Sequence, residues 1–271
     1  MEDFLNFFKE MPSAYKVAWI FIVLTITWVI EAAIPLVRND YKKWKHAGGN
    51  LIFLVTSMLI NLLFGIATVG IFLWTEKTGF GLLNWIDLPV WVELLLAVLI
   101  LDFIAQYAVH FMLHRVAWMW RFHMIHHSDT NVDATTGTRH HPGDYVLREI
   151  FALAGIIITG MPLAFYVFYR IATIFFTYWS HANINMPHWL DKTLSLVFIT
   201  PNMHKFHHHF ERPWTDTNFG NIFSFWDRIF GTMVHDDPRK VKYGLDVLDD
   251  KNADDVLYQF KLPFDKSIKT D

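Results

Sequence analysis

The sequence predicts an all-α, integral-membrane helical bundle of about four or five spans, with a helical cap on one side. Three observations support this fold class. The 271 residues are 53% hydrophobic and 18% charged, and their mean hydropathy is +0.25. Three apolar stretches are each long enough to cross a bilayer as a helix. Fourteen of the 15 histidines follow the third of these stretches and stand in close groups.

The composition also excludes several classes of protein. Because there is no cysteine, the chain has no disulfide framework, no thiolate zinc site, no cysteine-held iron–sulfur cluster and no cysteine nucleophile. Any bound metal must therefore sit on nitrogen or oxygen. The net charge of −3 offers no overall basic field, so we expect no nucleic-acid partner.

The three apolar stretches cover residues 14–37, 51–74 and 90–109. Each has about the 20 residues that a helix needs to cross the hydrocarbon core. No small-residue cleavage site follows the first stretch, so we expect it to be retained as a span and not removed as a signal peptide.

The connecting loops predict the orientation of these spans. Residues 38–46 carry several Lys and Arg, whereas residues 75–89 carry a single Lys. The positive-inside rule places the first loop in the cytoplasm, so the third span runs inward. His110 and the residues after it are then expected on the cytoplasmic side.

The rest of the chain predicts a hairpin and a tail. Residues 145–179 are apolar with a break at Gly160-Met161-Pro162, which predicts a helical hairpin with arms short for full crossings. Residues 236–271 form a charged tail without strong periodicity. No repeat or linker is visible, so we expect one membrane domain, made of N-terminal spans (12–110), a histidine-rich region (110–235) and the tail.

Three histidine groups follow the third span. His110 and His114 stand four residues apart, which places them on one face of a helix. The second and third groups repeat an H-x-x-H-H pattern, and Thr200-Pro201 before the third group predicts an N-cap and a first helical residue. These two groups contain His123, His126 and His127, and His204, His207 and His208.

Neutral imidazole binds iron, copper, nickel and zinc. Eight grouped histidines are too many for one ion, and with His181 the nine suffice for two ions of four to five protein ligands each. A metal pair at the cytoplasmic edge of an apolar bundle is placed to meet a lipid chain. Oxidation of an apolar C–H bond requires oxygen activation, which iron can perform and redox-inert zinc cannot.

Two other classes stay open at this point. A zinc-dependent membrane hydrolase should carry a general-base Glu, as in H-E-x-x-H, and none of the histidine groups contains one. A metal-ion transporter or binding protein should show polar residues at the bilayer midplane or an inverted repeat. Apart from Asp102, neither feature is visible.

The words around these histidines are specific in order and spacing. They read Asp102-Phe103, His110-x-x-x-His114, Trp120-Arg121-Phe122-His123-x-x-His126-His127-Ser128, Thr138-Arg139-His140-His141-Pro142, Ser180-His181-Ala182-Asn183, Thr200-Pro201-Asn202-Met203-His204-x-x-His207-His208, Asp216-x-Asn218-x-Gly220 and Trp226-Asp227-x-x-Phe230-Gly231-Thr232. Over roughly residues 90–235 the chain thus resembles the fatty acid hydroxylase / sterol desaturase superfamily.

This resemblance implies an integral-membrane, non-haem di-iron oxygenase. Such an enzyme uses O2 and two electrons to hydroxylate or desaturate a lipid-like substrate, such as a sterol or a fatty-acyl chain. The implied ligands of the two iron ions are His110, His114, His123, His126, His127, His181, His204, His207 and His208. No flavin, haem or nicotinamide motif is visible, so we expect a separate electron-donor protein of the ferredoxin, rubredoxin or cytochrome type.

The chain departs from the family pattern at two places. Some relatives carry a second histidine four or five residues after the equivalent of His181, where this chain has Asn185. Three alternatives stay open: ligation by the nine histidines alone, a ligand role for Asn185, or recruitment of His141. Related sequences often carry an acid after the His-Pro pair. This chain has Gly143-Asp144, and Asp144 is open for that role.

Other polar residues are expected to support the site. An acid inside a span is costly and by default functional, so we expect Asp102 to accept a hydrogen bond from a ligand histidine of another segment, and Asp227 to act similarly. Arg139 is expected to bind a lipid headgroup or to pair with a nearby aspartate, Asp129, Asp133 or Asp144. The simplest expectation for the remaining histidines is a surface or interfacial position: His46, His188, His209 and His235.

Overall fold

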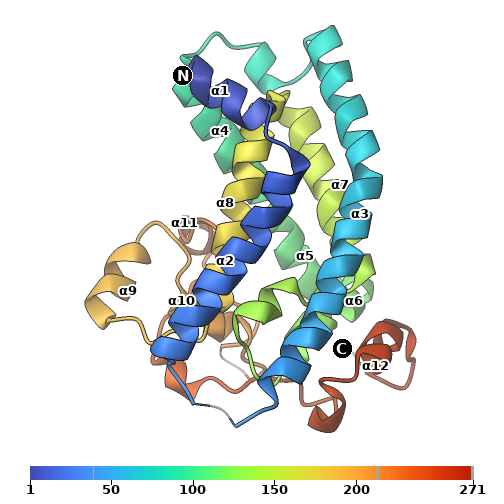
Figure 1. Cartoon of the computed structure of the whole chain (residues 1–271), viewed down its shortest axis with the longest axis vertical. Helices are drawn as coiled ribbons and strands as arrows, with labels where there is room; N and C mark the ends of the chain where they lie inside the picture. Colours follow the sequence, from blue (N-terminus) through green and yellow to red (C-terminus); the bar gives the residue numbers. More distant parts are fainter. Residues whose placement is uncertain (39, 212–213, 270–271) are drawn as a thin grey trace.

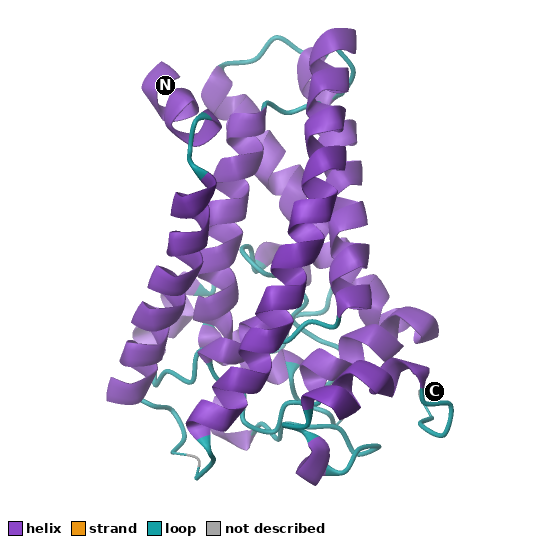
Figure 2. Cartoon of the chain, turned by 45° about the vertical axis from the view of Figure 1, so that its right-hand side comes forward, coloured by secondary structure: helices purple, strands orange, loops and turns teal. Residues whose placement is uncertain are grey.

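The computed structural model describes residues 1–38, 40–211 and 214–269 (Figure 1). Over these residues the chain forms helices and loops, with two isolated bridges that join Pro35 to Ile184 and Phe198 to Phe223. The long helices stand side by side, and most of the shorter helices gather with long loops at one end (Figure 2). The predicted all-α class is confirmed.

Three helical segments are long and apolar enough to cross a membrane: Ser13–Ala33 (α2), Lys43–Asn84, which contains α3 (Lys43–Thr78), and Val90–Arg115. They correspond to the three predicted stretches. α3 begins eight residues earlier than residue 51, because lysine and alanine favour a helix there and the buried His46 and Asn50 find polar partners in the cap.

Many apolar side chains of these helices face outward. On α3, Leu62, Leu63 and Ile66 are 73%, 70% and 80% exposed. Exposed apolar area of this extent is typical of a surface that is covered by another apolar phase, not by water. The outer face of α3 is therefore suited to contact lipid.

The third segment changes its helical geometry before the first histidines. It consists of α4 (Val90–Asp102), a π-helical stretch η2 (Phe103–Ala108) and α5 (Val109–Arg115). π-helical turns inside α-helices are rare and frequently mark functional sites. Here the π-helical stretch ends two residues before His110 and places Gln106 on the wall of an internal cavity.

The predicted hairpin is present as α7 (Pro142–Thr159) and α8 (Leu163–His181). The turn begins at Gly160, whose φ of +63° is strained for other residues, and an added Cβ would lie 2.3 Å from the Phe80 carbonyl oxygen. Pro162 precedes the first turn of α8. The hairpin therefore brings His181 back to the end of the bundle where α7 began (Figure 1).

The bundle core lies between α4, α7 and α8, where Leu101, Ala152 and Phe165 are buried together. At the opposite end from the cap, α1 (Glu2–Lys9) lies against α8, and its Phe4 and Phe8 rings stand 5.4 and 5.3 Å from the Phe168 ring. The remaining helices are short. η1 (Leu82–Asn84) lies between α3 and α4. The others build the cap: α6 (Ala117–His127), η3 (Ala134–Thr138), α9 (His188–Leu194), α10 (Pro201–His207), α11 (Phe225–Ile229), η4 (Pro238–Lys240), η5 (Asp250–Asn252), α12 (Val256–Lys261) and η6 (Leu262–Phe264).

The charged C-terminal tail folds back onto the cap. The tail residue Leu262 is buried against Phe53 of α3 and Met124 and Ile125 of α6. The Arg121 side chain of α6 donates from Nε to the Pro263 carbonyl oxygen at 2.7 Å. A few apolar residues and backbone carbonyls thus fix a segment whose composition shows no strong periodicity.

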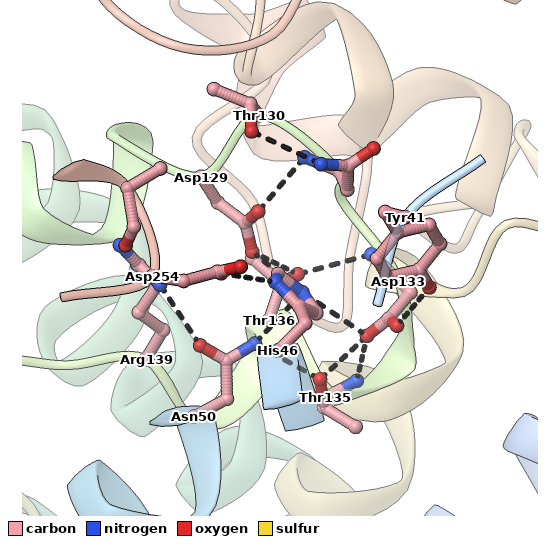
Figure 3. Close-up of polar contacts among 12 residues, drawn as sticks. Tyr41, His46, Asn50, Asp129, Thr130, Asp133, Thr135, Thr136, Arg139 and Asp254 are labelled. Carbon is pink, nitrogen blue, oxygen red and sulfur yellow. Dashed lines mark hydrogen bonds and ion pairs between the residues drawn. The ribbon is translucent and has the colours of Figure 1, made fainter. Parts of the chain in front are cut away.

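His46 lies in a buried polar network, contrary to the expected surface position (Figure 3). Its Nδ1 lies 3.0 Å from Asp254 Oδ1, and its Nε2 lies 3.1 Å from Asn50 Nδ2 and 3.4 Å from Asp129 Oδ2. Burial alone would raise the pKa of Asp129, but the nearby His46 and Arg139 hold that pKa well below its usual range. His209 is also buried, which corrects a second surface expectation.

Arg139 is buried and not placed at the surface for a lipid headgroup, and its hydrogen bonds go to neutral oxygens, although it lies near enough to Asp129 to act on that carboxylate. It is 2% exposed, and its donors serve Ile125 O (2.9 Å), Asn50 Oδ1 (3.1 Å), Ser128 Oγ (3.0 Å) and the Ala253 carbonyl oxygen (2.5 Å). The guanidinium fork matches several oxygens at once. It therefore joins α3, α6 and the C-terminal segment (Figure 3).

We predict that Arg139→Met destabilises the protein by about 2–4 kcal/mol, because it leaves several buried oxygens without a donor. The thermal unfolding midpoint of the purified protein in detergent should fall, and limited proteolysis should cut first near residue 253. The matched control is Arg239→Met, which changes an arginine that is 59% exposed. Equal midpoints for the two variants would contradict the proposed role of Arg139.

Candidate metal centre

Four segments bring nine histidines to the cap end of the bundle (Figure 1). α5 carries the first pair and α6 the second group, His181 ends α8, and α10 with the residue after it carries the third group. α10 begins as predicted: the Thr200 side chain accepts a hydrogen bond from the Met203 backbone N–H, and Pro201 is the first helical residue. The buried Lys205 donates to the Ala182 carbonyl oxygen at 2.7 Å and ties α10 to the end of α8.

The nine side chains divide into two groups, each with ring nitrogens within 4.8 Å of one another. The five-histidine group contains both histidines of α5, two from α6 and one from α10: His110, His114, His123, His127 and His207. The four-histidine group contains His126, His181, His204 and His208. α6 contributes histidines to both groups, and so does α10 with His208 after it. The two groups therefore lie side by side.

Several ring nitrogens face each other at short range. Nε2 of His110 lies 3.0 Å from Nε2 of His123, and Nε2 of His181 lies 3.1 and 3.0 Å from Nε2 of His126 and His204. Two nitrogens that each lie about 2.1 Å from one ion at a right angle are about 3.0 Å apart, whereas a tetrahedral angle separates them by about 3.4 Å. Ring nitrogens this close together are near enough to bind one ion.

A second observation tests the fit of a metal. Among the residues that the structure describes, several of these histidines keep a buried ring nitrogen without a hydrogen-bond partner, including Nε2 of His114, His127, His207 and His208. A buried polar atom without a partner costs about 1–3 kcal/mol, and such atoms are rare in folded proteins. Their concentration at one place fits donors that are reserved for metal ions.

The other ring nitrogen is often held by the protein. In three cases Nδ1 donates to a backbone carbonyl oxygen: His110 to Phe219 (2.8 Å), His181 to Thr177 (2.7 Å) and His207 to Thr217 (2.8 Å). Two aspartates play the same part: Asp216 Oδ1 lies 3.0 Å from His114 Nδ1, and Asp144 Oδ2 lies 2.9 Å from His123 Nδ1. A fixed Nδ1–H leaves the Nε2 lone pair free for a metal.

The environment keeps these imidazoles neutral. Burial lowers the pKa of His123 to about 3, although the neighbouring Asp144 opposes this shift. Five more histidines of the two groups also have a pKa well below the usual value, because they are buried and lie beside other histidines. They are His126, His127, His204, His207 and His208. Neutral imidazole is the form that binds metal.

Asp144 also contacts a residue that the sequence analysis did not select. His140 Nδ1 lies 2.8 Å from Asp144 Oδ2, and Arg148 Nε donates to Asp144 Oδ1 at 2.9 Å. The His140 ring stacks on the His126 ring at 4.6 Å. The i, i+4 spacing from His140 through Asp144 to Arg148 was the sequence signal that could have revealed this cluster.

We expected Asp227 to accept a hydrogen bond from a histidine, but it contacts the loop that precedes α11 instead. Its carboxylate accepts from the backbone N–H groups of Phe219 (2.8 Å) and Gly220 (3.0 Å) and from the Thr232 hydroxyl (2.7 Å). Because Phe219 O accepts from His110, Asp227 positions the oxygen that orients that imidazole.

The prediction that Asp102 accepts a hydrogen bond from a histidine is wrong. The Asp102 carboxylate accepts from Trp226 Nε1 at 3.1 Å and from the Tyr169 hydroxyl at 3.5 Å. It lies two turns before His110 and on the far side of η2, where the Trp226 ring of α11 reaches it. Asp102 thus joins the third span to the cap.

The two further ligand candidates lie outside both histidine groups. His141 caps α7, accepts from the Gly143 backbone N–H at 3.0 Å and stacks on Phe122. Asn185 is exposed, and its backbone N–H donates to the Ile34 carbonyl oxygen at 2.8 Å. The extended segment after His181 carries Asn185 away from the site, so neither residue joins the nine.

Two hollows lead to the histidine groups. The smaller, about 30 Å³, is lined by residues of both groups, among them His110, His126 and His204. The larger, about 150 Å³, lies between α3, η2, α7 and α8. Both are lined by Gln106, His140, Arg148 and Thr177. The hollows are therefore adjacent, and the larger one extends from the site into the bundle.

Comparisons with known proteins agree with this arrangement. The chain is 28% identical over 178 residues to an ornithine lipid hydroxylase of Rhizobium tropici, which covers 66% of this chain and 52% of that protein. It is also 28% identical over 247 residues to the alkylglycerol monooxygenase of Homo sapiens, which covers 88% of this chain and 51% of that protein. The chain thus spans about half the length of these relatives. No solved structure gives a significant match.

A family model described as fatty acid hydroxylase matches residues 94–232, more than half of the chain. This range contains all nine grouped histidines together with Asp102, Asp144 and Asp227. The chain belongs to the fatty acid hydroxylase family.

Proposed function

We propose that this chain is a membrane-embedded hydroxylase that oxidises a C–H bond of a lipid with O2 at a pair of non-haem iron ions. The observation that carries the proposal is the convergence of nine buried imidazoles in groups of five and four at the end of a cavity within the bundle. The names of the relatives, a lipid hydroxylase and a monooxygenase, favour hydroxylation over desaturation.

The donor set supports iron over zinc. A zinc site takes three or four protein ligands, and its preferred angles are tetrahedral. Here one group offers five histidines, more protein ligands than a zinc site takes. When bound, the iron pair supplies the activation of O2 and the electron transfer that C–H oxidation requires.

The protein supplies orientation and a dry environment. The Nδ1 hydrogen bonds to Phe219, Thr177 and Thr217 fix the rings of three ligand histidines from three different segments. The larger hollow has apolar walls, including Leu54, Met58 and Ile174, that can align an alkyl chain with one carbon at the histidines. Closely packed walls also exclude water from a reactive centre.

The basic connection between α2 and α3 supports a cytoplasmic position for the site. This connection lies at the same end of the bundle as the cap, and the Tyr41 hydroxyl within it donates to Asp133 of the cap at 2.6 Å. The positive-inside rule would place that end in the cytoplasm. Electrons would then reach the site from a cytoplasmic donor protein of the ferredoxin, rubredoxin or cytochrome type.

Metal analysis tests the two groups separately. The chain loaded with ferrous iron under anaerobic conditions should bind about two irons. His207→Ala in the five-histidine group and His204→Ala in the four-histidine group should each lower the content to about one. The control is His188→Ala, which changes an exposed histidine of α9. Two tightly held zinc ions with hydrolytic activity would favour a hydrolase instead.

Asp144→Asn should lower iron affinity about 10–100-fold, since an amide cannot match a carboxylate as acceptor for His123 and His140. Competition with a chelator measures this affinity, and circular dichroism of the helices serves as the folding check. Asp246→Asn, at an exposed position, is the control. Unchanged chelator competition would exclude a supporting role for Asp144.

The oxidation itself can be traced with isotopes. Membranes that contain the wild-type chain, a reductase and a donor protein should incorporate one atom of 18O from 18O2 into a membrane lipid, detected by mass spectrometry. The His207→Ala variant should give less than about 1% of this product, because removal of catalytic groups typically costs several orders of magnitude. Turnover by the purified chain with NADPH alone would contradict the need for a separate donor.

A further inference from the structure

A second polar cluster lines the larger hollow, apart from the nine histidines. Arg170 of α8 donates from Nη1 to Glu149 Oε1 of α7 at 2.7 Å. Its Nη2 donates to Asn61 Oδ1 of α3 at 2.9 Å and to the Tyr145 hydroxyl of α7 at 3.1 Å. Asn61 in turn donates to the Tyr145 hydroxyl at 2.6 Å. We refer to these four residues as the Arg170 cluster.

The cluster lies deeper in the bundle than the histidines. Arg170 precedes His181 by 11 residues on α8, which corresponds to about 16 Å along the helix. Glu149 follows Asp144 by five residues on α7, which corresponds to about 8 Å. Charged side chains at such depth are costly, and by default they mark a functional site. A purely structural contact could be made by apolar residues.

The hollow is lined by polar groups at several levels and by apolar side chains between them. His140, Arg148 and Thr177 line it near the histidines, and the Arg170 cluster lines it deeper in the bundle. Leu54, Met58 and Ile174 supply apolar wall between these levels. Arg170 is 28% exposed although it lies within the bundle, whereas Glu149 is 3% exposed. Arg170 and Tyr145 both line the hollow, so the cluster borders the space that a bound molecule would occupy.

The charge of the cluster limits what it can recognise. The arginine is paired with a carboxylate at 2.7 Å, so the cluster carries no net charge. An anionic group would meet Glu149 as well as Arg170, and it would lose its hydration on entry. The available donors come from a guanidinium, an amide and a phenol, which match a neutral acceptor oxygen.

We propose that the Arg170 cluster binds a neutral hydroxyl or carbonyl oxygen of the substrate, while the alkyl segment of the same molecule lies along the apolar walls toward the histidines. The proposal rests on the function proposed above, because it describes how that substrate is held. The substrate class is thus an alkyl chain with a neutral oxygen several carbons from the oxidised position. Free fatty acids and unsubstituted alkanes are disfavoured.

Binding without turnover tests this proposal. Iron-loaded protein in detergent, kept anaerobic and without reductant, is heated with hexadecan-1-ol, methyl palmitate, hexadecane or palmitate, and the unfolding midpoint gives the apparent affinity. One or both oxygen-bearing neutral probes should bind about tenfold more tightly than hexadecane and palmitate. The alcohol and the ester separate a hydroxyl from a carbonyl preference. Equal binding of all four probes, or tightest binding of palmitate, would overturn the proposal.

Variants connect the preference to the cluster. Tyr145→Phe removes one hydroxyl and should reduce the preference about threefold or more. The double variant Arg170→Gln, Glu149→Gln avoids an unpaired buried charge and should abolish it. The control is Arg239→Gln, Asp237→Asn, which alters an exposed ion pair and should keep it. Iron content near the wild-type value shows that a variant is folded, and a properly loaded double variant with intact preference would refute the assignment.

The outcome is separable from that of the proposed function. Incorporation of 18O into lipid without any preference among the four probes would contradict the Arg170 subsite but support the hydroxylase function. A preference for the neutral oxygen without incorporation of 18O would support the subsite but contradict the hydroxylase function.

Discussion

The structure depends on the burial of nine imidazoles in two groups, whose ring nitrogens lie within 4.8 Å of one another and in three pairs only about 3 Å apart. In an apolar interior such an arrangement is unfavourable by itself, because buried polar atoms without partners lose their hydration. Metal ions would turn that cost into a favourable interaction. The rest of the cap can be understood as the means by which separate segments are held still around these rings.

The supporting contacts come from chemically different sources. Backbone carbonyls orient His110, His181 and His207, whereas Asp144 and Asp216 lie against His123 and His114. Asp227 acts one step further out, through the loop that carries Phe219. The buried network around His46 and Arg139 fixes α6 against α3 and the C-terminal segment. Rings from four segments therefore keep their places without a disulfide or a β-sheet.

The sequence was sufficient for the features that local rules determine. Apolar length predicted the spans, Gly160 and Pro162 predicted the hairpin turn, and Thr200-Pro201 predicted the start of α10. Spacing selected the nine histidines that converge. It did not select His140, whose role depends on a shared carboxylate, and it placed His46 at the surface because its aspartate partners lie 83 and 208 residues away in the chain. Asn185 was a candidate by analogy, but a backbone bridge to Ile34 turns it outward.

The anchoring of α6 by the C-terminal segment affects how the protein is made. Ala253 and Pro263, which receive hydrogen bonds from Arg139 and Arg121, follow His208 by 45 and 55 residues. The ribosome therefore finishes all nine histidines well before it delivers the residues that hold α6, which carries three of them. At roughly 5–20 residues per second, several seconds separate the two events. A metal ion that arrived in that interval would meet histidines whose supporting contacts are still incomplete.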